Sequence, residues 1–278
     1  MRNNSHAKRD WARIAFNIGV VVLTLLVLMP FLWFVSMGFK SDDDIMAGSS
    51  SVLFTPTLEH YRDLVTPEFI RPFGNSLAAS LISTLLSLLI GVPGAYALAR
   101  APLRSERPLA LLILASRMVP PIAFTIPYFL VYRNIGLLDT VTGLVLIYMT
   151  FNLSLVVWLM RTFFEGTPRS LEEAAWIDGA SLWETFQKVV LPLCTPAVMT
   201  TGILCFIYSW NDFFFALTLT RTQAMTAPVQ VVNFMNYQGW EWGKIAASGT
   251  AILLPIFVFS MLMRRFLVHG MTAGAVKG

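Results

Sequence analysis

Charge is scarce in this chain of 278 residues, in which only 13% of the residues are charged while 56% are hydrophobic. A soluble domain needs roughly a quarter to a third of its surface residues charged to stay dispersed, so the composition excludes an ordinary soluble protein. We therefore expect much of the apolar surface to face lipid.

Residues that build catalytic and metal sites are also few. The two cysteines, Cys194 and Cys205, form no CxxC pair, and the three histidines are scattered along the chain. They predict no disulfide, metal site or catalytic constellation. The phosphate-binding pattern GxxxxGK[ST] is missing as well, because the pair Gly243 and Lys244 lacks both the upstream glycine and a following Ser or Thr. We expect no bound cofactor and no ATP site.

Long apolar segments, by contrast, dominate the chain and contain only two charged residues, Arg117 and Asp212. Each segment reaches or nearly reaches the roughly 20 residues that a helix needs to cross the hydrocarbon core. Their continuity is unlike the alternating pattern of a membrane β-barrel. The sequence predicts an all-α integral membrane protein with six transmembrane helices, at residues 14–39, 73–99, 108–132, 140–160, 196–220 and 245–263.

The distribution of Lys and Arg predicts the orientation of these helices. With the amino terminus in the cytoplasm, thirteen of these basic residues lie inside and six outside. The positive-inside rule then places both termini in the cytoplasm. The net charge of +4 follows mostly from this bias, so we expect no nucleic-acid partner. The first apolar segment is longer than the apolar core of a signal peptide, which has roughly 7 to 15 residues, and is expected to remain as a helix.

We divide the chain into three regions. Residues 1–72 hold the amino-terminal tail, the first helix and an outer loop, and residues 73–264 hold a core of five helices with a cytoplasmic connector at 161–195. Residues 265–278 form a cytoplasmic tail. The outer loop is either a solvated connector or a docking surface for an extracytoplasmic partner, because long ordered loops are often functional.

The cytoplasmic connector predicts two short helices joined at an elbow. Ser170 and Glu173 have the spacing of a capping box, and Ser181 and Glu184 have it again. Between them Gly179 suits the left-handed turn that ends a helix.

The second helix of the elbow should end near Leu191, because Pro192 restricts its predecessor and cannot donate a backbone hydrogen bond. Small or apolar residues recur at helical spacing beside charged residues on both helices, which predicts an amphipathic surface under the membrane. That surface either lies in the lipid interface or docks on a partner protein.

The connector resembles the EAA loop of bacterial ABC importer permeases, whose pattern is EAA, three residues, G, nine residues and IxLP. Here the pattern reads Glu173-Ala174-Ala175, Gly179 and Val189-Val190-Leu191-Pro192, with valine in place of the usual isoleucine. The stretches LFTPTLEHY at 53–61, WND at 210–212 and GMTAGAVKG at 270–278 also look like carbohydrate importers of the maltose-transporter type. They are similar to the shorter, six-helix permease of such systems.

The resemblance implies a type I ABC importer permease fold in the inner membrane of a bacterium. It implies a complex with a second permease chain, two ATPase subunits and an extracytoplasmic solute-binding protein. This chain would be a non-catalytic subunit that forms half of the pathway for an oligosaccharide, disaccharide or polyol, while the ATPase uses ATP and Mg²⁺.

The family also implies contacts with the ATPase. In the EAA loop they fall on Glu172, Glu173, Ala174, Ala175, Asp178, Gly179, Leu191 and Pro192. The tail would reach the same interface through Thr272, Gly274 and Lys277, or would be a frayed terminus.

Four residues within the apolar segments are candidates for the translocation pathway: Arg117, Trp210, Asn211 and Asp212. A charge at the membrane centre costs about 2.5–3.5 kcal/mol on insertion scales, so such residues usually face a bundle interior or a water-filled path. Arg117 precedes two prolines, which predicts a helix broken within the membrane. Aromatic and polar groups near Asp212 suit a sugar, although Asp212 could instead pair with a neighbouring helix.

Two other functions are weighed against this interpretation. An ion-coupled secondary transporter would need carboxylates within the membrane for its coupling ion and commonly has an internal repeat. The apolar segments contain a single carboxylate, that of Asp212, and the sequence has no evident repeat. An intramembrane enzyme would need a His, Ser or Asp constellation that the chain does not supply.

Overall fold

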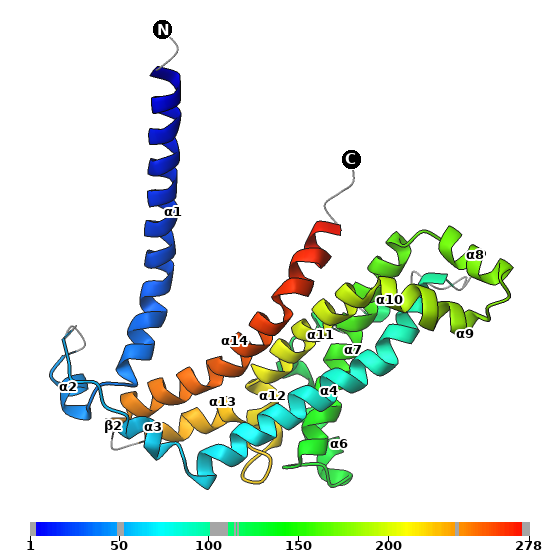
Figure 1. Ribbon diagram of the computed structural model, residues 1–278. Coiled ribbons are helices and arrows are strands. Elements are labelled where there is room, and N and C mark those ends of the chain that lie inside the picture. Colours follow the sequence, from blue (N-terminus) through cyan, green and yellow to red (C-terminus); the bar gives the residue numbers. More distant parts are fainter. Residues whose placement is uncertain are drawn as a thin grey trace. The chain divides into compact units, whose positions relative to one another are not determined.

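A computed structural model describes residues 4–48, 53–100, 111–113, 115, 117–236 and 239–273 (Figure 1). These residues are mainly helical, and the chain divides into two compact units, Met1–Thr66 with Asn233–Ala251 and Pro67–Val232 with Ile252–Gly278. The second unit holds both regions that the sequence marks as functional, the elbow and the intramembrane charges.

The first unit contains one long apolar helix and several short elements. Its elements are α1 (Asn4–Met37), α2 (Asp42–Met46), α3 (Glu59–Asp63), the hairpin of β1 (Met235–Asn236) and β2 (Gly239–Trp240), and the first part of α14 (Trp242–Ala273). The Ser41 hydroxyl caps α2 by accepting from the Asp44 amide at 3.2 Å. His60 is buried, with its Nε2 2.9 Å from the carbonyl oxygen of Lys40.

The second unit is a bundle of helices around α4. Its elements are α4 (Pro67–Arg100), α6 (Pro121–Asn134), α7 (Val141–Gly166), α8 (Ser170–Ile177), α9 (Leu182–Thr185), the π-helix Phe186–Val190, α10 (Leu191–Leu193), α11 (Thr195–Trp210), α12 (Phe214–Leu219) and α13 (Ala227–Gln230), with the end of α14. A 3-10 turn, Val231–Phe234, follows α13.

Helices α4, α7 and α11 pack closely because small residues lie where they meet. A Cβ atom built on Gly91 of α4 would come within 2.7 Å of the Val156 side chain on α7. On α11, a Cβ atom built on Gly202 would come within 3.0 Å of the Leu88 side chain on α4. In lipid no hydrophobic driving force joins helices, so close backbone approach and dispersion contacts hold the bundle together.

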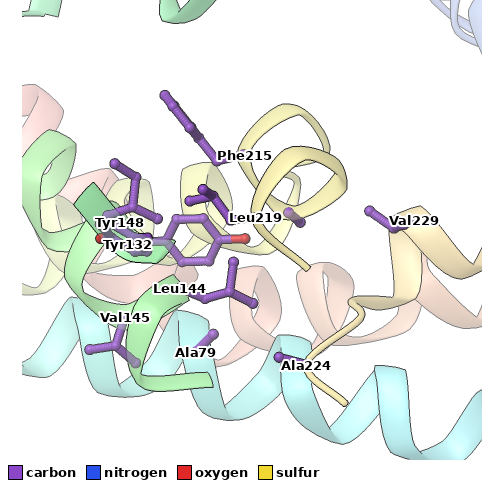
Figure 2. Close-up of a cluster of buried hydrophobic side chains, with 11 residues drawn as sticks. Ala79, Tyr132, Leu144, Val145, Tyr148, Phe215, Leu219, Ala224 and Val229 are labelled. Atoms are coloured by element: carbon purple, nitrogen blue, oxygen red, sulfur yellow. The ribbon is translucent and has the colours of Figure 1, made fainter. Parts of the chain in front are cut away.

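Two buried hydrophobic clusters form the core of the bundle. Figure 2 shows the first, which includes Ala79 of α4, Leu144 and Tyr148 of α7, and Phe215 and Leu219 of α12. The second cluster lies toward the elbow and joins the ends of α4 and α7 to the π-helix; it includes Val92, Ala95, Ala99, Val156, Met160, Phe164, Phe186 and Val190.

Four helices of the described residues are long and apolar enough to cross a membrane: Arg13–Met37, Pro67–Arg100, Val141–Gly166 and Trp242–Met261. They coincide with four of the predicted segments, although α4 begins at Pro67 instead of residue 73. The third predicted segment, 108–132, lies partly outside the described residues. Its described part is broken at Pro120 and resumes at Pro121, as the two prolines predict.

The fifth predicted segment, 196–220, is wrong as a single straight helix. Helix α11 ends at Trp210 and α12 starts only at Phe214, so a break at residues 211–213 interrupts it. At its other end α11 follows the helical stretch Leu182–Leu193 after a bend of 76°. The mean apolarity of the segment hides the first break, although two polar residues, Asn211 and Asp212, lie in it.

Gly91→Val should destabilise the bundle by about 1–3 kcal/mol, because the added methyl groups would overlap Val156 and force α4 and α7 apart. Gly94→Val is the matched control, since no atom lies within 4 Å of its added Cβ on the same helix. Thermal unfolding of the purified protein in detergent measures both. Equal melting temperatures for the two variants would contradict the packing argument.

Candidate functional site

The elbow forms largely as its glycine and second cap predict. Gly179 has φ +85°, a left-handed conformation that suits glycine. The Ser181 hydroxyl accepts from the Glu184 amide at 3.3 Å, and Glu184 Oε2 accepts from the Ser181 amide at 3.1 Å. This second capping box is confirmed.

The first predicted capping box, at Ser170 and Glu173, is wrong. Helix α8 takes Arg169 as its cap residue, and no side chain caps it. The carbonyl of Pro168 already accepts from the Leu171 amide, and that of Arg169 accepts from Glu173. The helix therefore begins one residue early, which moves Ser170 into its first turn.

The predicted end near Leu191 is displaced by two residues. The chain widens into a π-helix at Phe186–Val190, where the Leu191 amide donates to the Phe186 carbonyl five residues back, and it stays helical to Leu193. The wider turn relieves the clash that Pro192 would make with an α-helical carbonyl. The bend then comes at Cys194.

One face of the elbow is exposed and mixes acidic with apolar side chains. Glu173, Ala174, Asp178, Gly179 and Pro192 are exposed, while Ala175 and Leu191 are half-buried. The large apolar side chains exposed beside them are Leu171, Trp176, Ile177, Leu182 and Trp183. An apolar patch rimmed by charge in this way is typical of a surface that contacts another protein or a membrane.

Glu172 does not belong to this exposed face, contrary to expectation. Its side chain is 1% exposed and pairs with the guanidinium of Arg100 at 2.7 Å. Its second carboxylate oxygen accepts from the Tyr96 hydroxyl at 2.8 Å. Helical spacing places Glu172 one residue away from Glu173 and therefore on another side of α8, where it faces the end of α4. A direct contact of Glu172 with another protein is excluded while this pair is intact.

A polar pocket lies within the bundle between α6, α7, α11 and α12. Its volume is about 220 Å³, and its lining consists of Arg117, Val119, Pro121, Tyr148, Phe151, Asn152, Tyr208, Ser209, Asp212 and Phe215. Polar groups and aromatic rings thus meet in one cavity of the bundle. Sites that bind small molecules commonly have this combination.

Hydrogen bonds order the polar side of the pocket. Asp212 Oδ2 accepts from the Tyr148 hydroxyl at 3.1 Å and from the Ala216 amide at 3.0 Å. The Asn152 side chain donates to the Ser209 hydroxyl at 2.9 Å. Asp212 therefore pairs with a neighbouring helix, caps α12 and lines the cavity at the same time.

The structure brings two of the four predicted pathway residues into the pocket. The guanidinium carbon of Arg117 lies 4.7 Å from the centre of the Tyr208 ring. Asp212 lies in the break between α11 and α12. Trp210 does not line the pocket, because it is buried and donates its indole N–H to the Ile252 carbonyl at 3.1 Å. Asn211 is exposed and donates back to the Ile207 carbonyl of its own helix.

Sequence reasoning missed Tyr148, Asn152, Tyr208 and Ser209 as pocket residues. It started from the two charged residues and their sequence neighbours, whereas Asn152 is an amide within another apolar segment and is itself a recognisable signal. Ser209 precedes Asp212 by three residues, a spacing at which side chains of a helix lie on one side, so it could have been named together with Asp212. The choice of Trp210 and Asn211 came from their sequence neighbours, not from helical spacing.

Outside the membrane segments, Asp139 holds a loop at the far end of the bundle. Its carboxylate accepts backbone N–H groups of Arg221, Thr222, Gln223 and Ala224 at 2.9–3.1 Å. Partial burial raises the pKa of Asp139, but these four donors together outweigh it and hold the pKa well below its usual range.

Of the predicted tail contacts, Thr272 lies in α14, whereas Gly274 and Lys277 fall outside the described residues.

Residues 87–273 match the family described as binding-protein-dependent transport system inner membrane component. The chain belongs to this family. The predicted ABC importer permease is thereby confirmed, and the match favours it over a secondary transporter.

Individual relatives cover nearly the whole permease. It is 39% identical to the trehalose transport system permease protein of Mycobacterium tuberculosis, over 93% of this chain and 96% of that protein. It is 33% identical over the full length of both chains to a probable ABC transporter permease of Sinorhizobium fredii. The crystal structure of a bacterial ABC transporter involved in the import of the acidic polysaccharide alginate matches with a TM-score of 0.74 at 26% identity, covering 93% of this permease and 97% of that chain.

Asp139→Ala should loosen residues 221–224 and lower the melting temperature of the purified permease, because four backbone donors lose their acceptor. Because the pKa of Asp139 is lower in the folded than in the unfolded chain, its carboxylate stabilises the fold at pH values above the unfolded pKa of about 3.9. This stabilisation is lost as the pH falls below that value. The difference from wild type should therefore be constant at neutral pH and shrink below about pH 4.

Asp43→Ala is the control for this prediction, because it removes an exposed acid from α2. A difference for Asp139→Ala that stayed unchanged down to about pH 3 would contradict the role of the carboxylate charge.

Proposed function

We propose that this permease is a membrane-spanning subunit of an ATP-driven, binding-protein-dependent importer of a sugar or polyol. The observation that carries the proposal is the polar and aromatic pocket, which lies in the same helical unit as an exposed acidic and apolar elbow. Relatives named as trehalose and trehalose/maltose permeases support a sugar as the solute.

The proposed topology has six transmembrane helices in the bacterial inner membrane, with both termini in the cytoplasm. The third helix would consist of the residues before Pro120 together with α6, and the fifth of α11 with α12. The excess of Lys and Arg in the connectors on one side supports this orientation. The elbow then lies in the cytoplasm and the Asp139 loop outside.

The pocket would contact the solute as part of a pathway shared with a second permease chain. Asn152, Ser209 and Asp212 offer amide, hydroxyl and carboxylate groups to sugar hydroxyls. Tyr208 and Phe151 offer ring faces to the apolar side of a pyranose. This chain would contribute one wall of the pathway and no chemical step.

The exposed face of the elbow would dock on one of two ATPase subunits, which bind ATP and Mg²⁺. Glu173, Ala174, Ala175, Asp178 and Gly179 form its acidic and small-residue part. A tail contact at Thr272, Gly274 and Lys277 would extend this interface. An extracytoplasmic binding protein would deliver the solute to the opposite side.

Glu173→Ala should reduce transport-coupled ATP hydrolysis by about 10-fold, as expected for the loss of one charge-assisted contact. Among the described residues Glu173 makes no ion pair or side-chain hydrogen bond, so its loss should leave folding intact. Hydrolysis by the reconstituted complex, with the loaded binding protein present, is the measurement. Glu165→Ala, at the end of α7, is the control, and equal coupled activity in both variants would end the docking role of Glu173.

Asp212→Asn should raise the KM for uptake by about 10-fold or more while the complex still assembles, because a carboxylate acceptor becomes a neutral amide. Asparagine keeps one side-chain oxygen that can accept from Tyr148 or Ala216, so α12 stays capped. Uptake into proteoliposomes of the solute carried by the binding protein measures the effect. Asn211→Ala, outside the pocket, is the control; an unchanged KM for Asp212→Asn would rule out direct solute contact.

A further inference from the structure

The buried pair of Arg100 and Glu172 carries a large desolvation free energy in the second unit. Their side chains are 13% and 1% exposed, so both charges are largely removed from water. Desolvation offsets much or all of the attraction in such a pair, and replacing it with apolar residues is often neutral or stabilising. Stability alone therefore does not account for an ion pair at this position.

The pair joins three elements at one guanidinium group. Arg100 is the last residue of α4; its Nε donates to Glu172 of α8 at 2.7 Å, and its terminal nitrogen donates to the Thr167 carbonyl after α7 at 3.0 Å. The planar guanidinium fixes the directions of these bonds. Helix α8 consequently cannot rotate against α4 or α7 without breaking a buried charge-assisted contact.

Tyr96 reinforces this connection one turn earlier on α4. Its hydroxyl donates to the second oxygen of Glu172 at 2.8 Å, so both carboxylate oxygens are occupied. Its ring packs against Phe164 of α7 at 5.5 Å and against Phe186 of the π-helix at 4.9 Å between centroids. Both arms of the elbow are thereby fastened to the same end of α4.

The same helices are joined again beside the pocket. Asn152 of α7 donates to Ser209 of α11 at 2.9 Å, and Ser83 of α4 lies 3.4 Å from the same hydroxyl. Asn152 and Ser209 line the pocket. Helices α4 and α7, each continuous between the two places, therefore connect a polar contact at the elbow with a polar contact at the pocket.

We propose that Arg100, Glu172 and Tyr96 are positioning residues that transmit displacement of the elbow to α4 and α7, and so to the pocket. The inference rests on the proposed function, in which the ATPase moves the elbow. An ion pair suits this task because it holds a defined geometry, whereas an apolar contact of equal area would allow the helices to slide.

The test measures movement directly in the complete complex, with both permease chains and ATPase subunits in nanodiscs. Nitroxide labels at Leu89→Cys on α4 and Ile126→Cys on α6, both exposed, report the distance between a helix held by the ion pair and one outside it. Electron spin resonance records this distance before and after addition of ATP and Mg²⁺. The native cysteines are buried, and the complex without added cysteines gives the background.

Four variants separate transmission from folding. Glu172→Gln removes the charge at nearly constant shape, and Arg100→Gln/Glu172→Gln removes both charges, so that no buried charge is left unpaired. Tyr96→Phe removes only the hydroxyl bond. Glu165→Gln is the matched control, because it removes the exposed ion pair with Arg161 on α7.

We expect ATP to shift the distance in the wild type and in Glu165→Gln, and the shift to be lost in the single and double glutamine variants while ATP hydrolysis continues. Tyr96→Phe should give a smaller shift. A wild-type shift retained in the double variant would overturn the inference, because the pair would then serve folding only. The same holds if the wild type shows no shift while it hydrolyses ATP. If no ATPase subunit stays with the wild-type complex, the proposed function itself fails.

Discussion

The hydrocarbon interior of the membrane offers no partner to a polar group, and the architecture follows from this constraint. Backbone groups must be satisfied within helices, so the spans are helical. Two hydroxyl side chains on α4 donate back to their own helix: Ser80 to the Ser76 carbonyl at 2.6 Å, and Ser83 to the Ser80 carbonyl at 3.2 Å. Small residues such as Gly91 let helices approach until dispersion contacts hold them. Polar chemistry is consequently confined to a few places.

Two of those places are a break and an end of a helix. Where α11 stops at Trp210, Asp212 accepts the Ala216 amide of α12 and faces the pocket. Where α4 ends, Arg100 satisfies the carbonyl that follows α7 together with a carboxylate of α8. At each place the side chain satisfies a backbone group, and the other polar groups beside it are available for a solute or for coupling to a partner.

Local chemistry predicted some of the elbow and missed the rest for a definite reason. Gly179 and the Ser181 cap depend on a few consecutive residues, so their spacing was sufficient. Ser170 had the same spacing, but Pro168 had already started the turn. Glu172 and Glu173 look alike in the sequence. Only the contact of Glu172 with Arg100 of α4, which is distant in sequence, shows that Glu172 is in a buried ion pair while Glu173 is exposed.

The sequence by itself determined that this is a helical membrane protein with a turn at Gly179 in its connector, because both properties reside in contiguous composition and spacing. It also marked Arg117 and Asp212, since a charge in an apolar run stands out. Only the tertiary structure decided that Trp210 belongs to the core, that Tyr148 and Asn152 face the pocket, and that Glu172 holds α8 to α4. These roles depend on which faces of different helices meet, and that is set by packing between residues far apart in the chain.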